Sequence, residues 1–205
     1  MFDSIFQILY LIGLIGMETI RFPYRMQNKR DRRSGKIQKE AASWFDITLE
    51  LISFIGAEVI PLIYLFSTWL DFADYQLPAW LGWIGWLGAL LFAGALILLR
   101  RAHTDLGKNW SPSLQIVPDQ HVVTTGIYAV LRHPIYAAVW LSMIAQALLL
   151  NNWIAGLAGI VTFLPVYLVR VPKEERMMLE QFGQEYQDYM QRVGGLIPKR
   201  NQISK

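Results

Sequence analysis

The chain has 205 residues, of which 54% are hydrophobic and only 17% charged, and its mean hydropathy is +0.29. This balance is too apolar for an ordinary soluble domain and indicates an integral membrane protein. The absence of cysteine excludes disulfides and thiolate metal sites, and three histidines without close ligand spacing argue against a zinc centre.

Five apolar stretches have about the length that a membrane-spanning helix needs. In chain order they cover residues 4–20, 47–70, 80–99, 135–150 and 153–169. The first does not resemble a cleavable signal peptide, because it lacks a basic start and a small-residue cleavage site. We therefore expect an all-α integral membrane protein with five transmembrane helices, forming a single membrane domain over residues 1–205.

The charges between these stretches predict how the chain crosses the membrane. Residues 21–45 are rich in lysine and arginine, the segment between the second and third spans carries Asp71 and Asp74 but no basic residue, and residues 100–134 are basic again. The positive-inside rule then places the N-terminus outside and the C-terminus in the cytosol of a multi-pass protein of the inner cell membrane. Nucleic-acid binding is not expected, because the basic run lies beside lipid and has no interleaved aromatic residues.

Several residues inside the predicted spans have a structural interpretation. Glycines at three-residue spacing favour close helix packing, and tryptophans at the outward ends are typical of an interfacial belt. These residues are Gly82, Gly85, Gly88, Trp69, Trp80, Trp83 and Trp153. Two acids are less easily explained: Glu50 lies close enough to the cytosolic end to reach water, whereas Glu58 is deeper, beside a proline, Pro61, that can break the helix and free a carbonyl.

Charged residues stand at both ends of the last apolar hairpin. Arg132 and His133 precede it, and the cluster that starts at Arg170 follows it. If the chain folds back at residues 151–152, both groups return to the same face of the membrane. Residues 1–99 would then hold three spans with a basic cytosolic loop at 21–45. Residues 100–205 would hold a cytosolic loop at 100–134, a helical hairpin at 135–169 and a cytosolic helix at 172–192.

Each charged group leaves an alternative open. His133 precedes a proline that suits the first turn of a helix, whose free N–H groups can receive a ligand, yet Arg132 and His133 could also merely hold a span at the lipid headgroups. In the second cluster the acids after Pro172 suit a helix N-terminus. Arg170 lies inside the bilayer edge and needs an anionic partner, either Glu174 or a bound substrate.

Three groups of residues together resemble one known family. They are Leu-Gly with Asn-Trp-Ser at 106–111, Gly-Ile-Tyr with Arg-His-Pro-x-Tyr at 126–136, and Arg, Glu-Glu, Phe-Gly-x-Glu-Tyr and Tyr at 170–189. Phospholipid methyltransferases and sterol reductases share Arg-His-Pro-x-Tyr, but the later motifs at this distance make the match specific. From Leu106 to Pro198 the chain resembles the isoprenylcysteine carboxyl methyltransferase family, in its short prokaryotic form.

The resemblance implies S-adenosylmethionine as cofactor, bound without the G-x-G-x-x-G turn of soluble methyltransferases, which is missing here. By analogy Arg170 would hold the acceptor carboxylate. The implied cofactor contacts are Gln115, Gln120, His121, Val122, Val123, Tyr128, His133, Pro134, Ile135, Tyr136 and Glu174. The cytosolic cofactor site would thus combine the loop before the fourth helix with the C-terminal helix.

The resemblance also implies an activity, which is carboxyl O-methylation of an isoprenylcysteine-like or other amphipathic lipidic acceptor. The expected partners are the bilayer and a lipophilic carboxylate substrate, with no nucleic acid and no metal, and the expected state is a monomer. Two alternatives stay open: a phospholipid or amine N-methyltransferase, and an NADPH-dependent sterol-type reductase of similar architecture. A non-enzymatic membrane scaffold would give no reason for Arg170, Glu174 and His133 to converge.

Overall fold

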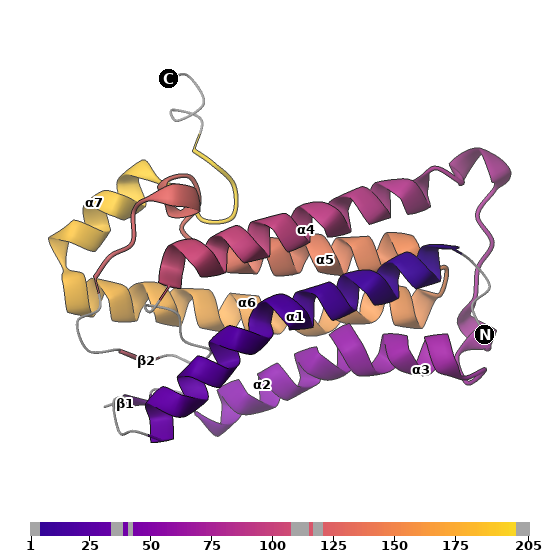
Figure 1. The fold of residues 1–205 in the computed structure, drawn as a ribbon, viewed down its shortest axis with the longest axis horizontal. Helices are drawn as coiled ribbons and strands as arrows, with labels where there is room; N and C mark the ends of the chain where they lie inside the picture. The colour runs from indigo at the N-terminus through magenta and orange to yellow at the C-terminus, as the bar shows by residue number, and fades with distance from the viewer. Residues whose placement is uncertain (1–4, 34–38, 41–42, 108–114, 117–120, 200–205) are drawn as a thin grey trace.

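The computed structural model describes residues 5–33, 39–40, 43–107, 115–116 and 121–199, and its helices run roughly along one axis (Figure 1). The helices are α1 Ile5–Arg33, α2 Trp44–Phe54, α3 Ile60–Phe66, α4 Ile84–Leu106, α5 Pro134–Leu149, α6 Trp153–Phe182 and α7 Gln184–Arg192. Two short strands, β1 Lys39–Glu40 and β2 Gln115–Ile116, pair antiparallel. This pairing, which joins the loop after α1 to the loop after α4, was not expected from the sequence.

Four stretches are long and apolar enough to cross a membrane: Ile5–Asp31, Trp44–Phe66, Ala79–Leu106 and Trp153–Phe182. The chain is therefore a multi-pass membrane protein. The expected fourth span is present as α5, a shorter apolar helix of 16 residues. At 1.5 Å per residue it rises about 24 Å, which is less than the thickness of a typical hydrocarbon core. The prediction of an all-α bundle is confirmed. Of the five predicted spans, four correspond to long apolar stretches, and the remaining one corresponds to the shorter helix α5.

Two helices continue beyond the expected ends of their spans. Residues 21–33 belong to α1 rather than to a loop, and Glu18 forms ion pairs with Arg21 and Arg25 on the same helix. The prediction that a separate helix starts at residue 172 is wrong, because α6 runs without a break through Pro172 to Phe182. The break falls instead at Gly183, whose φ of 53° is a left-handed conformation that glycine adopts easily.

The second span is interrupted by one π-helical turn, Ile55–Val59, between α2 and α3. The carbonyl of Gly56 accepts a hydrogen bond from Gln146 Nε2 (3.2 Å), and that of Ala57 accepts one from the Tyr10 hydroxyl (2.9 Å). The expected disturbance of the helix before Pro61 is thus confirmed, and side chains of α5 and α1 satisfy the freed carbonyls.

The fold-back between α5 and α6 is confirmed at residues 151–152. Asn152 is fully buried, and its side-chain oxygen accepts from the N–H groups of Ile154 and Ala155 at the start of α6. Its amide nitrogen donates to Leu70 O (2.7 Å) and to Asp74 Oδ1 (2.8 Å). One side chain therefore caps α6 and ties the hairpin to the loop between α3 and α4.

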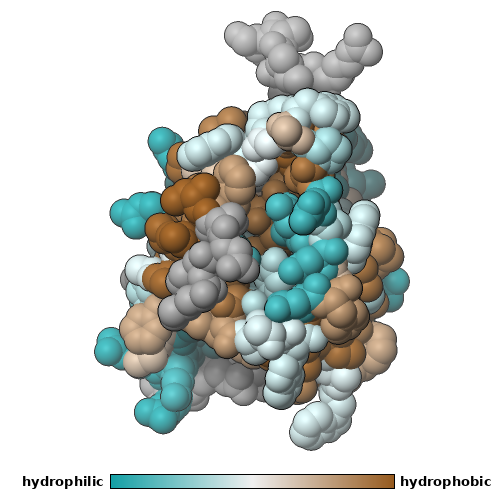
Figure 2. Space-filling view, turned by 90° about the vertical axis from the view of Figure 1, so that its right-hand side faces the viewer, coloured by the Kyte–Doolittle hydropathy of each residue, from teal (hydrophilic) through white to brown (hydrophobic). Residues whose placement is uncertain are grey.

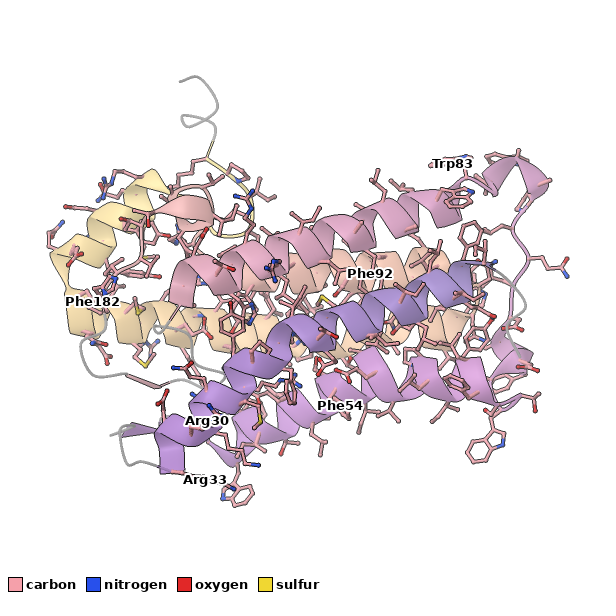
Figure 3. All side chains as sticks on the ribbon, viewed as in Figure 1. Arg30, Arg33, Phe54, Trp83, Phe92 and Phe182 are labelled. Carbon is pink, nitrogen blue, oxygen red and sulfur yellow. The ribbon has the colours of Figure 1, made fainter. Side chains whose placement is uncertain are left out.

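The two ends of the bundle differ in character. Trp83 lies at the end opposite Arg30, Arg33 and Phe182 (Figure 3). The four predicted belt tryptophans are all well exposed, and Figure 2, which looks onto their end of the molecule, shows hydrophilic side chains among pale and hydrophobic ones. Close glycine packing is confirmed at Gly85, which faces the Phe6 ring, and at Gly88, which faces Leu148 and Leu149, whereas Gly82 has no side chain against it.

Candidate active site

A cavity of about 730 Å³ runs inside the bundle, with walls from α1, α2, α4, α5, α6 and α7. Ten of the predicted site residues line it: His121, Val122, Val123, Tyr128, His133, Pro134, Ile135, Tyr136, Arg170 and Glu174. Gln115 lies on strand β2, but its side chain falls outside the described part of the structure, as does Gln120 entirely. Residues far apart in the sequence thus surround one space.

Arg132 ties the start of α5 to two other elements. Its Nε and Nη2 donate to Glu175 Oε1 of α6 (3.2 and 2.7 Å). Its Nη1 donates to the carbonyls of Val193 (2.5 Å) and Met190 (3.2 Å) at the C-terminal end of α7, where a cation suits the helix dipole. Because this side chain is only 12% exposed, Arg132 serves to join α5, α6 and α7 and does not reach lipid headgroups as the alternative interpretation supposed.

His133 is held at the cavity wall by the same carboxylate. Its Nε2 lies 2.9 Å from Glu175 Oε1, and the residue is 7% exposed. The backbone N–H of His133 also donates to the carbonyl of Gly195 (3.2 Å). Glu175 therefore fixes the orientation of the imidazole. The expected capping role for the acids after Pro172 is wrong, because α6 is continuous there and has no N-terminus to cap.

Glu174 faces the cavity one helix position earlier. The Tyr136 hydroxyl donates to Glu174 Oε1 (2.5 Å), and Arg170 Nε lies 3.8 Å from the same oxygen. The Tyr136 ring is stacked on Phe163 of α6, with ring centroids 6.2 Å apart. Glu174 is thus a carboxylate in a fixed position that lines the cavity and is 26% exposed.

Arg170 has a second partner that the sequence interpretation missed. It forms an ion pair with Glu50 of α2, and one turn earlier Asp46 pairs with Lys173 at 2.6 Å. The expectation that Glu50 reaches water agrees with its 45% exposed side chain, but its ion pair with Arg170 was not expected. The sequence carries one signal of this docking, which is that acids four apart in α2 match bases three apart in α6, so each set lies on one helix face.

Helix α7 covers the polar end of the cavity with aromatic side chains. Tyr186 and Tyr189 pack with Val122 and Val193, and the Tyr189 hydroxyl donates to the Tyr128 carbonyl (2.6 Å). Burial raises the pKa of Tyr189 to about 12, and burial likewise raises the pKa of Tyr186, so both stay neutral hydroxyls at neutral pH. Helix α7 thus packs against the domain, and Gly183 separates it from α6.

A second set of charges lies across the cavity on the N-terminal side. Glu18, Arg21, Arg25 and Glu58 all line the cavity there, and Glu18 pairs with both arginines. In the part of the chain that the structure describes, no group of three or more His, Cys, Asp or Glu side chains is placed to hold a metal ion. The expected absence of a metal stays a prediction.

The fold and this cavity define a membrane-embedded protein with a polar, partly enclosed site, and comparisons with known proteins then show which family it resembles. Residues 86–180 match the model of the isoprenylcysteine carboxyl methyltransferase (ICMT) family. The matched segment holds most of the motifs that carry the resemblance; the short prokaryotic form stays a prediction.

Individual relatives agree over part of their length. The chain is similar to protein-S-isoprenylcysteine O-methyltransferase B of Arabidopsis thaliana, with 30% identity over 50% of this chain and 53% of that protein. It is also similar to the enzyme of Tribolium castaneum, with 30% identity over 64% of this chain and 49% of that one. A solved structure of the eukaryotic intramembrane Ras methyltransferase ICMT aligns with a TM-score of 0.49 at 26% identity, over 74% of this chain and 50% of that chain. The chain spans about half the length of the curated relatives it matches.

Proposed function

We propose that this chain is an integral membrane S-adenosylmethionine-dependent methyltransferase that methylates the carboxylate of an isoprenylcysteine-like or other amphipathic lipidic acceptor. The observation that carries the proposal is the meeting of His133, Tyr136, Arg170 and Glu174 at one end of a partly enclosed cavity. The match of residues 86–180 to the ICMT family model supports it.

The polar end of the cavity suits a cationic cofactor. S-adenosylmethionine supplies a methyl group on a positively charged sulfur and also carries an ammonium. Among the described side chains here, Arg170 faces two carboxylates, Glu50 and Glu174, so this set has a net negative charge. Glu174 would bind the cationic end of the methionine moiety, and residues 121–123 and 133–136 would surround the rest.

The protein's part in the reaction is alignment. A carboxylate acceptor is already ionised at neutral pH, so no general base is needed. Arg170 would hold that carboxylate through paired hydrogen bonds. Tyr136 keeps Glu174 in place, Glu175 keeps His133 in place, and α7 with its aromatic residues shields this end from water.

We further propose that the site faces the cytosol of an inner cell membrane, with the N-terminus outside. The basic end of α1 lies at the same end of the bundle as α7, opposite the exposed tryptophans, which supports this orientation (Figure 3). Cysteines introduced at Ser34 or Lys108 should resist impermeant thiol reagents in intact cells, and one at Asp74 should react. Labelling of Lys108→Cys from outside would contradict the orientation.

Purified protein tests the activity directly. With radiolabelled S-adenosylmethionine and extracts of lipids and small prenylcysteines, we expect label in a product that releases methanol in base, as a methyl ester does. The protein should bind S-adenosylmethionine or its demethylated product and should not bind NADPH. Tight NADPH binding without any response to S-adenosylmethionine would instead support the reductase.

A second candidate is N-methylation of an amine, because Glu50 and Glu174 outnumber Arg170 beside the cavity and would attract a cation. The same experiment separates the two candidates. An N-methyl product keeps its label in base, whereas a methyl ester loses it, so base-stable label in a lipid amine would replace the carboxyl assignment.

A further inference from the structure

An ion pair occupies the guanidinium that an acceptor carboxylate would need. Arg170 Nη1 contacts Glu50 Oε1, and Arg170 Nε lies 3.8 Å from Glu174 Oε1. The Arg170 side chain is only 11% exposed, whereas that of Glu50 is 45% exposed and lines the cavity. The cation is therefore enclosed in the bundle, and one of its carboxylates stands in the space that an acceptor would enter.

We propose that Glu50 is a specificity-determining residue: an internal carboxylate that occupies Arg170 until an acceptor carboxylate displaces it, and that returns once the acceptor has been methylated. This inference rests on the proposed carboxyl methyltransferase function. Exchange of one carboxylate for another keeps Arg170 paired throughout, so that a buried cation is never left without an anion. A neutral lipid cannot make this exchange and is rejected.

The two carboxylates beside Arg170 differ in their freedom to move. Glu174 lies one turn from Arg170 on the same helix and accepts the short hydrogen bond from Tyr136. Glu50 comes from α2 and is the more exposed of the two. When Glu50 releases Arg170, the ion pair of Asp46 with Lys173 still holds α2 on α6, because Asp46 is 2% exposed and also accepts a hydrogen bond from the backbone N–H of Ser43. A side-chain movement is thus sufficient for the exchange.

The reaction itself changes which carboxylate Arg170 prefers. An acceptor oxygen forms a bond to the methyl carbon while the methyl–sulfur bond breaks and its electron pair stays on sulfur. The acceptor thereby changes from an anion to a neutral ester. A neutral ester can still accept hydrogen bonds from Arg170 but lacks the attraction between opposite charges, so Glu50 now competes better than the product for Arg170. Glu50 would exclude neutral lipids before the reaction and promote release of the ester after it.

Binding of an acid and its ester tests this role without turnover. The probes are N-acetyl-S-farnesylcysteine and its methyl ester, measured by calorimetry with S-adenosylhomocysteine present. In Glu50→Gln the competing charge is gone, so both probes should bind about three- to tenfold more tightly, because the fraction of Arg170 available to them rises. In turnover assays the same variant should show correspondingly stronger inhibition by the ester.

A matched control breaks the neighbouring ion pair instead. Lys173→Gln removes the charge that pairs with Asp46 but keeps an amide that can still donate to it, so α2 stays on α6 and both affinities should remain within about twofold of the wild type. If Glu50 only positioned Arg170, Glu50→Gln would weaken binding of the acid and leave the ester unchanged. Unchanged or weaker acid binding therefore overturns the proposal.

Two further outcomes are separable. If Glu50→Gln does not fold, Glu50→Asp keeps the charge but shortens the side chain; both probes should still bind more tightly, by a smaller factor, and weaker acid binding would again overturn the role. If the wild type methylates the acid and only the shift in Glu50→Gln is missing, this inference alone fails. If the wild type neither binds nor methylates the acid, the carboxyl methyltransferase function fails, and this inference fails with it.

Discussion

Two arginines beside the cavity are held in contrasting ways. Arg132 shares a partly buried carboxylate, Glu175, with His133 and also donates to two carbonyls at the end of α7. Arg170 pairs with Glu50, which is 45% exposed and belongs to a different helix. The first arrangement has several mutually dependent bonds and fixes three helices, whereas the second is a contact that another anion can replace. One arginine therefore builds the site, and we propose that the other can exchange its partner for a ligand.

The largest effect is expected from removing the fixed arginine. Arg132→Ala leaves Glu175 with His133 alone and removes the hydrogen bonds that Arg132 donates to the carbonyls of Met190 and Val193, so we expect a loss of about 3–5 kcal/mol in stability. Thermal unfolding in detergent should show a clearly lower midpoint, and cofactor binding should fall with it. Arg100→Ala removes an exposed arginine of α4 and serves as control, with a change within about 0.5 kcal/mol. Equal midpoints for the two variants would mean that Arg132 does not hold these helices together.

A smaller effect is expected where the fixed network meets the cavity. His133→Ala removes the imidazole that Glu175 orients and leaves the contacts of Arg132 in place. Binding of S-adenosylmethionine should weaken by roughly 1.5–3 kcal/mol, on the order of ten- to a hundredfold, if the ring makes a charge-assisted contact. Calorimetry measures this change. Unaltered affinity would remove His133 from the cofactor site and leave it a structural role.

The smallest effect is expected at the far end of the bundle. Asn152→Ala loses the cap of α6 and the contacts to Leu70 and Asp74, which should cost about 0.5–2 kcal/mol of stability. Because this turn lies away from the cavity, the affinity for S-adenosylmethionine should not change. Asn151→Ala is the matched control at the neighbouring position, and thermal unfolding compares the two. A loss of cofactor affinity in Asn152→Ala would show that the two ends of the bundle are coupled.

Local patterns in the sequence predicted much of this molecule. Apolar runs located the helices, and the polar pair at residues 151–152 between two such runs located the fold-back. Pro134 at the first position of α5 and the aromatic face of α7 were also predictable, because they depend on neighbours within a few turns. The motifs that carry the resemblance to the ICMT family lie in this C-terminal half.

Features that depend on tertiary contacts could not be predicted in this way. Proline followed by acidic residues is typical of a helix start, yet α6 continues through Pro172. Glu50 and Arg170 are 120 residues apart in the sequence, so only the docking of α2 on α6 shows that they form an ion pair. Arg132 pairs with Glu175 and not with Glu174 because of the side of α6 that faces α5. The charges of the two glutamates are the same, so the sequence alone could not predict which of them is the partner.

Separating Arg170 from Glu174 tests the central claim most directly. Calorimetry of S-adenosylmethionine binding, together with turnover, should be measured for Arg170→Ala, Arg170→Lys and Glu174→Ala. We predict that Arg170→Ala keeps nearly full cofactor affinity while methyl transfer collapses, and that Arg170→Lys recovers little, because an ammonium cannot make the planar paired contact of a guanidinium with a carboxylate. Glu174→Ala should lose cofactor affinity by roughly 1.5–3 kcal/mol. Equal loss of cofactor affinity in Arg170→Ala and Glu174→Ala would contradict the account, since Arg170 would then be a structural partner of Glu174 and not the residue that holds the acceptor.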